Sequence, residues 1–394
     1  MKQNILKTGK DYREIDDYIK GSGYKRVMLV CDEALGFLKL KGYFDTAEER
    51  LDISLTRFDH IQPNPLYEGV VEGVEMFRKN GCDAIIAVGG GSVMDTAKGI
   101  KLYARMDPDV LYLEQEIVPN DIPLAAVPTT AGTGSEATRY AAIYYNGVKQ
   151  SVTHESAIPQ TVFVDPSVLA TLPEYQKKAT AMDALCHCIE SYWSVNSNDE
   201  SFGYSDEGIR LIMENIDGYI ANDEKANEAM LYAANLAGKA INITQTTAGH
   251  AMCYKLTSLY GTAHGHAAAL CTAELWPYMT THMEKCIDER GEEHLQMIFE
   301  KIAAAMGCDS VDDAIKRFAG VLERLDLRPP VPFESDYEIL KTSVNPVRLG
   351  NFPVKLDEEA IDMLYHRILS PKMSRTAPAD VTNLIDDNMV KTSA

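Results

Sequence analysis

The chain has 394 residues, of which 45% are hydrophobic and 24% charged, and its formal net charge is −20. This composition is that of a globular protein, and the length favours two domains over one. A surface this acidic argues against nucleic-acid binding, which needs clustered lysines and arginines. It does not exclude an anionic substrate, because a few local cations can dominate a site.

The N-terminal 20 residues contain no apolar stretch of signal-peptide length, and no uncharged apolar run approaches 18 residues. The eight cysteines form no Cys-x-x-Cys pair, which is typical of reduced thiols in a cytosolic protein. We therefore expect a cytoplasmic protein with no membrane span and no membrane partner.

The first 165 residues alternate short apolar runs with helical patterns. The apolar runs cover residues 27–30, 84–88, 124–127 and 161–164. Residues 67–80 lie between two of these runs and form an amphipathic helical pattern. Such alternation predicts a parallel sheet with crossover helices. Residues 139–152 resemble a polar hairpin inserted in this domain, with its turn at Asn146-Gly147.

The pattern changes after Asp165-Pro166, where long segments with a 3.6-residue period replace the strand-like runs. These segments cover residues 178–193, 202–220, 225–243, 264–280, 294–306, 310–325 and 357–369. The sequence predicts a dinucleotide-binding α/β domain at 1–168 and a helical domain at 169–394. The cleft between two such domains is the expected place for a ligand.

A glycine-rich stretch, Val88–Lys98, follows one predicted strand and opens a helix. Its three consecutive glycines let the backbone approach a ligand closely, and Ser92 is expected to be the N-cap of the helix. Free amides at a helix start favour a phosphate group, so the stretch predicts a nucleotide site. An ordinary strand-to-helix turn without a ligand is the alternative.

A second loop, Val127–Glu136, also follows a short strand, and its hydroxyls and glycines suit a dinucleotide. Asp32 ends the first apolar run, where a carboxylate can accept hydrogen bonds from a ribose and would repel a 2′-phosphate. This position favours NAD(H), with NADP(H) possible. A surface turn is the alternative role for Asp32.

Four residues in the helical half form a candidate metal site. Asp183 and His187 are four residues apart on a predicted helix and so share one face. His250 and, after a glycine-containing loop, His264 add two imidazoles. One carboxylate and three imidazoles suit a divalent transition metal. Each residue alone has an ordinary alternative, because a helical Asp–His pair is usually a salt bridge and a lone histidine is usually part of the core.

Taken together, these motifs resemble the iron-containing, group III alcohol dehydrogenase family over nearly the whole chain. The motifs are Pro63-Asn-Pro65, GGGSVMDTAK, VPTTAGTGSEAT, DALCH and the His-Gly pair. The resemblance implies a Rossmann-like α/β N-terminal domain plus an all-α C-terminal domain, the dehydroquinate synthase-like fold. It also implies NAD(P) across the cleft, with Fe²⁺ or Zn²⁺ as the metal, and a homodimer or larger homo-oligomer.

Matched residue by residue, the family's metal ligands fall on Asp183, His187, His250 and His264. Its cofactor positions fall on Asp32, Asn64, Gly90, Gly91, Ser92, Asp95, Thr129, Thr130, Thr133 and Lys149.

One position departs from the family pattern. The family usually has a histidine four residues after the third metal ligand, and here that residue is Tyr254, followed by Lys255. A phenol can relay a proton, so Tyr254 is a candidate catalytic residue. Lys255 adds a positive charge that suits an anionic substrate, with Arg139 as a further candidate cation. A solvent-directed side chain is the alternative for Lys255.

The stretches SYWSVNSNDES and TTAGHAMCYKLTSLYGTAHGHAAAL are most similar to the phosphonoacetaldehyde reductase branch. This likeness implies reduction of phosphonoacetaldehyde to 2-hydroxyethylphosphonate, with NAD(P)H as the hydride donor. The alternatives are a dehydrogenase for a neutral substrate (butanol, 1,3-propanediol or lactaldehyde), a lyase resembling 3-dehydroquinate synthase, and a non-catalytic protein that keeps the fold.

Overall fold

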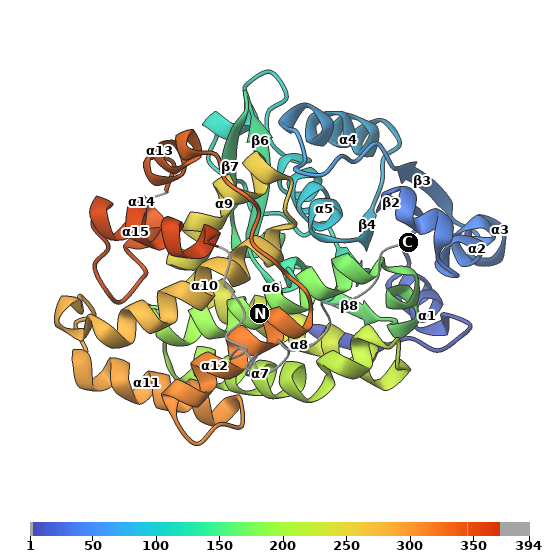
Figure 1. Ribbon diagram of the computed structural model, residues 1–394. Coiled ribbons are helices and arrows are strands. Elements are labelled where there is room, and N and C mark those ends of the chain that lie inside the picture. Colours follow the sequence, from blue (N-terminus) through green and yellow to red (C-terminus); the bar gives the residue numbers. More distant parts are fainter. Residues whose placement is uncertain (1–2, 345, 371–394) are drawn as a thin grey trace, which may run out of the picture.

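The computed structural model describes residues 3–344 and 346–370 (Figure 1). Its N-terminal part is built on a six-stranded sheet with the order β1-β8-β5-β4-β2-β3, in which every neighbouring pair is parallel. The strands are β1 (Asn4–Lys7), β2 (Arg26–Cys31), β3 (Ser54–Phe58), β4 (Ala84–Gly89), β5 (Leu124–Pro128) and β8 (Thr161–Val164). The predicted parallel α/β sheet is therefore confirmed.

The central strands are apolar throughout because both faces of the sheet are covered. Every residue of β4, β5 and β8 is buried. On one face α4 (Tyr67–Lys79) packs on β3 and α5 (Gly91–Tyr103) on β4 and β5. The shorter helices α1 (Arg13–Ser22), α2 (Leu40–Asp45) and α3 (Ala47–Leu51) also lie in this part.

The strand order has a switch point at the carboxyl ends of β2 and β4. These two strands are neighbours, but the chain leaves β2 towards β3 and leaves β4 towards β5, in opposite directions. Ligands of open α/β sheets bind outside the strand ends at such a switch point. The glycine-rich stretch after β4 lies at this position.

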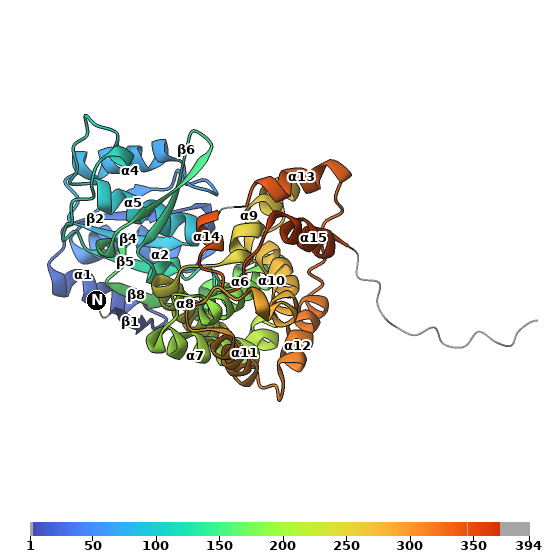
Figure 2. The ribbon, with the colours of Figure 1, turned by 90° about the vertical axis from the view of Figure 1, so that its left-hand side faces the viewer.

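The predicted hairpin is also confirmed. Strands β6 (Tyr140–Tyr145) and β7 (Val148–Thr153) pair in antiparallel fashion. Asn146 and Gly147 connect them with φ of 50° and 75°, the positive values that a two-residue hairpin turn requires. The hairpin packs on α5 and projects beside the helical part (Figure 2).

The helical part begins with α6 (Glu174–Trp193), which packs against α7 (Asp199–Ile220), α8 (Glu224–Thr244) and α10 (His264–Thr281). Helix α9 (Ala248–Tyr260) packs on α10. The remaining helices are α11 (Glu292–Ala305), α12 (Val311–Arg324), α13 (Glu334–Thr342), α14 (Pro346–Leu349) and α15 (Glu358–Leu369). None of the described helices is long and apolar enough to cross a bilayer.

One local expectation is wrong. Helix α5 begins at Gly91 with Gly90 as its N-cap, so Ser92 lies in the first turn and is not the capping residue. Gly90 adopts the extended conformation of an N-cap without a side-chain bond, which leaves the amides of the helix start unsatisfied by a cap. The predicted domain boundary after residue 168 falls within a short 3-10 helix, Pro166–Thr171, and stays a prediction.

Candidate metal and cofactor site

The predicted metal ligands begin on α6, the most buried helix of the helical part. Asp183 and His187 are four residues apart on its inner face and keep only 2% and 5% of their surface exposed. Such burial of a carboxylate is costly without compensation, so this pair needs a partner of opposite charge or a hydrogen-bond donor.

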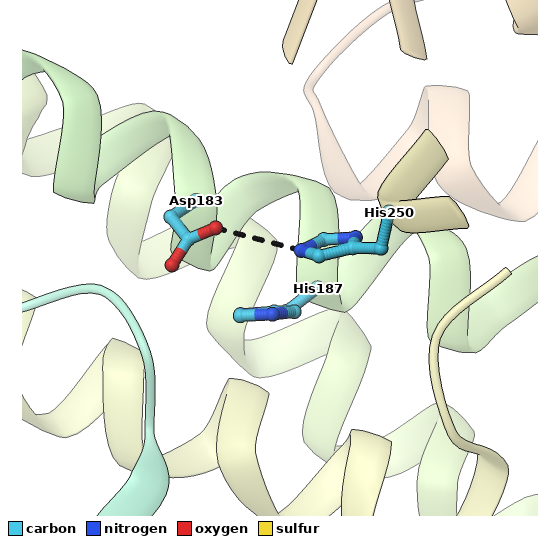
Figure 3. A group of neighbouring side chains, drawn as sticks. All are labelled: Asp183, His187 and His250. Carbon is cyan, nitrogen blue, oxygen red and sulfur yellow. Dashed lines mark ion pairs between the residues drawn. The ribbon is translucent and has the colours of Figure 1, made fainter. Parts of the chain in front are cut away.

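Helix α9 adds His250 to this pair. The His250 Nε2 atom lies 3.5 Å from Asp183 Oδ1, and its ring stacks on that of His187 with 4.4 Å between centroids. One potential ligand atom from each of the three residues lies within 4.8 Å of the others (Figure 3). The structure thus brings three of the four predicted ligands together.

The fourth predicted ligand, His264, is adjacent but outside that group. It is the first residue of α10, and its ring centroid lies 5.2 Å from that of His250. Gly261, with φ of 65°, ends α9 in the left-handed conformation and turns the chain towards α10. Gly265 lets α10 approach α6 closely, because a Cβ there would lie 2.5 Å from the Asp183 Cβ.

The site has unmet bonding capacity that fits a cation. Asp183 Oδ1, His187 Nδ1 and His250 Nε2 are buried and have no hydrogen-bond partner. Buried polar atoms are normally paired, so a cluster of three such atoms without a hydrogen bond calls for an explanation. A carboxylate and imidazoles are suitable ligands for a divalent transition metal, and the donor set therefore fits the expected group.

The electrostatics of the cluster agree with a cation site. Burial would raise the pKa of Asp183, but the neighbouring His187, His250 and His264 hold it well below its usual range. Burial lowers the pKa of His187 to about 4 and that of His264 to about 3. Asp183 is therefore ionised and these two imidazoles are neutral at pH 7, which are the forms that bind metals. Against the effect of burial, Glu190 and Asp183 raise the pKa of His250 to about 10, so a metal would bind there in exchange for a proton.

The sequence analysis missed Glu190. This residue is fully buried on α6, and its Oε1 atom lies 2.6 Å from His250 Nδ1. It follows Asp183 by seven residues, so it shares the face that carries Asp183 and His187. This spacing was the signal that could have identified it.

The two predicted cofactor loops lie side by side at the carboxyl edge of the sheet. A Cβ on Gly90 would lie 3.3 Å from Thr130 Cγ2, and one on Gly91 would lie 3.1 Å from Thr133 Cγ2. The Thr129 amide also donates to the Gly89 carbonyl at 3.0 Å. The absence of side chains at Gly90 and Gly91 thus lets the second loop lie directly against the start of α5.

The second loop also reaches the metal-ligand cluster. A Cβ on Gly132 would lie 2.7 Å from the Cβ of Thr180, which is one turn before Asp183 on α6. A dinucleotide lying on the loops would consequently have one end beside the cluster.

Among the other predicted cofactor residues, Asp95 already has protein partners. One of its oxygens accepts from Ser135 Oγ at 2.6 Å and the other from the Ala142 amide at 3.0 Å. Asp32 follows β2 and accepts from the Ala34 amide, and Asn64 is exposed with φ of 60°. Contacts between these residues and a cofactor stay predictions.

Tyr254 and Lys149 meet across the two parts of the molecule. The Tyr254 ring stacks on His264 with 5.6 Å between centroids, and the Lys149 ammonium from β7 lies 4.2 Å from the Tyr254 ring centroid. Lys255 is half-buried on α9 and forms no ion pair within the described residues. Arg139 instead pairs with Glu155 at 2.6 Å, which occupies part of its guanidinium.

Comparisons with known proteins find two matching family models. Residues 3–166 match the model described as "Iron-containing alcohol dehydrogenase". Residues 177–340 match that of the "Fe-containing alcohol dehydrogenase family, C-terminal".

Curated relatives and a solved structure agree with these matches. The chain is 33% identical to alcohol dehydrogenase 4 of Saccharomyces cerevisiae, over 69% of this chain and 72% of that protein. It is 32% identical to phosphonoacetaldehyde reductase of Streptomyces viridochromogenes, over 72% and 75%. A crystal structure of sulfoacetaldehyde reductase from Bifidobacterium kashiwanohense in complex with NAD+ is similar with a TM-score of 0.83 and 25% identity, over 93% of this chain and 97% of that chain.

Proposed function

The chain belongs to the iron-containing alcohol dehydrogenase family, and from this premise we propose that it reduces phosphonoacetaldehyde to 2-hydroxyethylphosphonate. As a member of this family the chain is an oxidoreductase of the alcohol dehydrogenase and aldehyde reductase type, which uses NAD(H) and a divalent metal. The choice of substrate and the roles of individual residues belong to the proposal.

The observation that carries the metal assignment is the set of three buried side-chain atoms without a hydrogen bond on Asp183, His187 and His250, among the described residues. In the proposal these residues and His264 hold the divalent ion. When bound, the ion supplies Lewis-acid polarisation of a carbonyl group, and NADH supplies a hydride. The burial of the ligands excludes bulk water from the reacting carbonyl.

The cofactor binds along the two glycine-containing loops, with the free amides at the start of α5 facing its phosphates. Asp32 receives the adenosine ribose at the end of β2, which favours NADH. Tyr254 is the proposed proton donor, since its phenol can hold a proton at Oη and its ring lies against His264. Aldehyde, NADH and one proton then give alcohol and NAD+.

The proposed anionic substrate rests on two cations near Tyr254. Lys149, which the family resemblance matches to a cofactor position, lies over the Tyr254 ring and forms no ion pair within residues 3–344 and 346–370. Lys255 is the next residue on α9. In a chain with a net charge of −20, two lysines without acidic partners beside a candidate site favour an anionic substrate group. Arg139 is left out of this subsite because it is paired with Glu155.

A neutral substrate is the second candidate, because the chain is similar to alcohol dehydrogenase 4 as well as to phosphonoacetaldehyde reductase. The lyase alternative finds no support, since the family is one of oxidoreductases. A cytoplasmic location and a homodimer or larger assembly remain parts of the proposal.

The test is an NADH-oxidation assay of protein reloaded with Fe²⁺ or Zn²⁺, using phosphonoacetaldehyde, sulfoacetaldehyde, butyraldehyde and lactaldehyde. We expect the highest kcat/KM with phosphonoacetaldehyde. A higher kcat/KM with butyraldehyde or lactaldehyde would favour the neutral substrate. If none of the four aldehydes oxidises NADH, the proposed reaction is wrong.

A further inference from the structure

Glu190 is a buried carboxylate to which the proposed function gives no role. Its side chain is fully buried on α6, and among residues 3–344 and 346–370 no lysine or arginine pairs with it. Burying a carboxylate without a cation is costly, so its retention here points to a specific partner.

All the hydrogen bonds of Glu190 point to helix α9. One oxygen, Oε1, lies 2.6 Å from His250 Nδ1. The other, Oε2, accepts from the backbone amide and from the hydroxyl of Thr247, each at 2.6 Å. Glu190 therefore fixes both the start of α9 and the imidazole that lies one turn further on.

The contact with Oε1 determines which nitrogen of His250 faces the cluster. A carboxylate acceptor keeps the hydrogen of a neutral imidazole on Nδ1, so the lone pair lies on Nε2. That Nε2 atom is the one that lies 3.5 Å from Asp183 Oδ1 and has no hydrogen-bond partner. Both the orientation and the tautomer of His250 thus suit a ligand on Nε2.

The carboxylate is itself held firmly. Thr247 Oγ1, which donates to Glu190, accepts from Trp193 Nε1 at 2.9 Å. Gly249 leaves space for the carboxylate, because a Cβ there would collide with Glu190 Oε1 and lie 2.9 Å from Thr272 Oγ1. Glu190 consequently has little freedom to turn away from His250.

Charge gives a second, separate reason for this placement. Asp183 and Glu190 put two carboxylates in one buried cluster with His187 and His250. A divalent cation carries two positive charges. Asp183 and Glu190 together would balance both of them, whereas Asp183 alone would balance only one.

From these contacts we propose that Glu190 is a positioning residue, which acts through His250 to strengthen divalent-cation binding at the Asp183–His187–His250 cluster. The inference rests on the metal site of the proposed function. Outer carboxylates that orient a histidine ligand typically contribute 10- to 100-fold in metal affinity.

The test measures the dissociation constant for Zn²⁺ by chelator competition on the full chain, in wild type and in Glu190→Gln. The substitution keeps size and removes charge, and we expect the affinity to fall by about 10- to 100-fold. Glu174→Gln is the matched control, since it makes the same change at an exposed position of the same helix. Thr247→Val removes one bond to Oε2 but leaves the bond from the Thr247 amide and the His250 contact, so it should lose less affinity than Glu190→Gln.

Circular dichroism of the metal-free proteins checks that each variant is folded. If Glu190→Gln does not fold, Glu190→Asp is measured in its place. This variant keeps the charge, but its side chain is shorter by one methylene, so the carboxylate moves away from His250. We expect its Zn²⁺ affinity to fall about tenfold. Wild-type affinity in the folded variant would overturn the inference, and so would an equal loss in Thr247→Val. A wild-type protein that binds no Zn²⁺ would instead refute the metal site of the proposed function.

Discussion

Gly265 offers a sharp test of how the metal-ligand cluster is assembled. It directly follows His264 at the start of α10, where this helix lies against α6. In Gly265→Ala the new methyl group would lie 2.5 Å from the Asp183 Cβ and 3.0 Å from the Asp183 Cα, and it would also meet the Ala179 carbonyl. Backbone atoms surround it, so no flexible side chain can move away.

The size of the effect follows from these distances. Ordinary contact begins at 3.4 Å, so the start of α10 must move away from α6 by about 1.2 Å to clear the Ala179 carbonyl, which is the nearest atom. Overpacking of this kind costs roughly 1–3 kcal/mol of stability. A misplacement of about 1 Å in a catalytic group can reduce turnover by about 100-fold. We expect both effects, because His264 moves together with Gly265.

The assay combines kcat/KM for aldehyde reduction, Zn²⁺ affinity and the free energy of unfolding. Gly203→Ala is the control: Gly203 lies in α7 with nothing within 4 Å of an added Cβ, and alanine there should stabilise the helix by about 0.5–1 kcal/mol. Wild-type Zn²⁺ affinity and turnover in Gly265→Ala would refute the idea that the α6–α10 contact places His264.

Three further predictions concern lysines and the cofactor. Burial lowers the pKa of Lys98 to about 8, so the folded chain loses this proton at a lower pH than the unfolded chain does. Between pH 8 and 10.5 the free energy of unfolding of wild type relative to Lys98→Met should therefore rise with pH, by up to about 1.4 kcal/mol per pH unit. Urea unfolding across this range checks it, and the same pH dependence in both proteins would contradict it. Lys149→Met should raise the KM for phosphonoacetaldehyde about tenfold and change the KM for butyraldehyde little. A higher KM for NADH with either aldehyde as the substrate would instead assign Lys149 to the cofactor. Asp32→Ser should raise kcat/KM for NADPH about tenfold, equivalent to about 1.4 kcal/mol; an unchanged NADPH preference would leave Asp32 without a role in selecting the cofactor.

Much of the fold could be predicted because its signals are local. The strands with apolar runs are buried on both faces, and the Asn146-Gly147 turn has the dihedral angles that its residues favour. Strand β1 gave no such signal. Two of its four residues are exposed and two are half-buried, and it pairs with β8 through residues as far apart as Asn4 and Thr161.

The candidate site could be predicted only in part. Asp183 and His187 were visible as a pair because one helix carries both of them. The approach of His250 depends on the packing of α9 and α10 against α6, which no local spacing encodes. Glu190 was missed because a glutamate on a helix is usually exposed; its spacing of seven residues from Asp183 was a weak signal, and its contact with His250 is what sets it apart.

The most direct test of the account is a crystal structure of the Zn²⁺-loaded protein, with the metal located by anomalous scattering. The account predicts one strong peak among Asp183, His187, His250 and His264, and its loss on treatment with a chelator. A peak elsewhere in the molecule, or none among these four residues at saturating Zn²⁺, would contradict it.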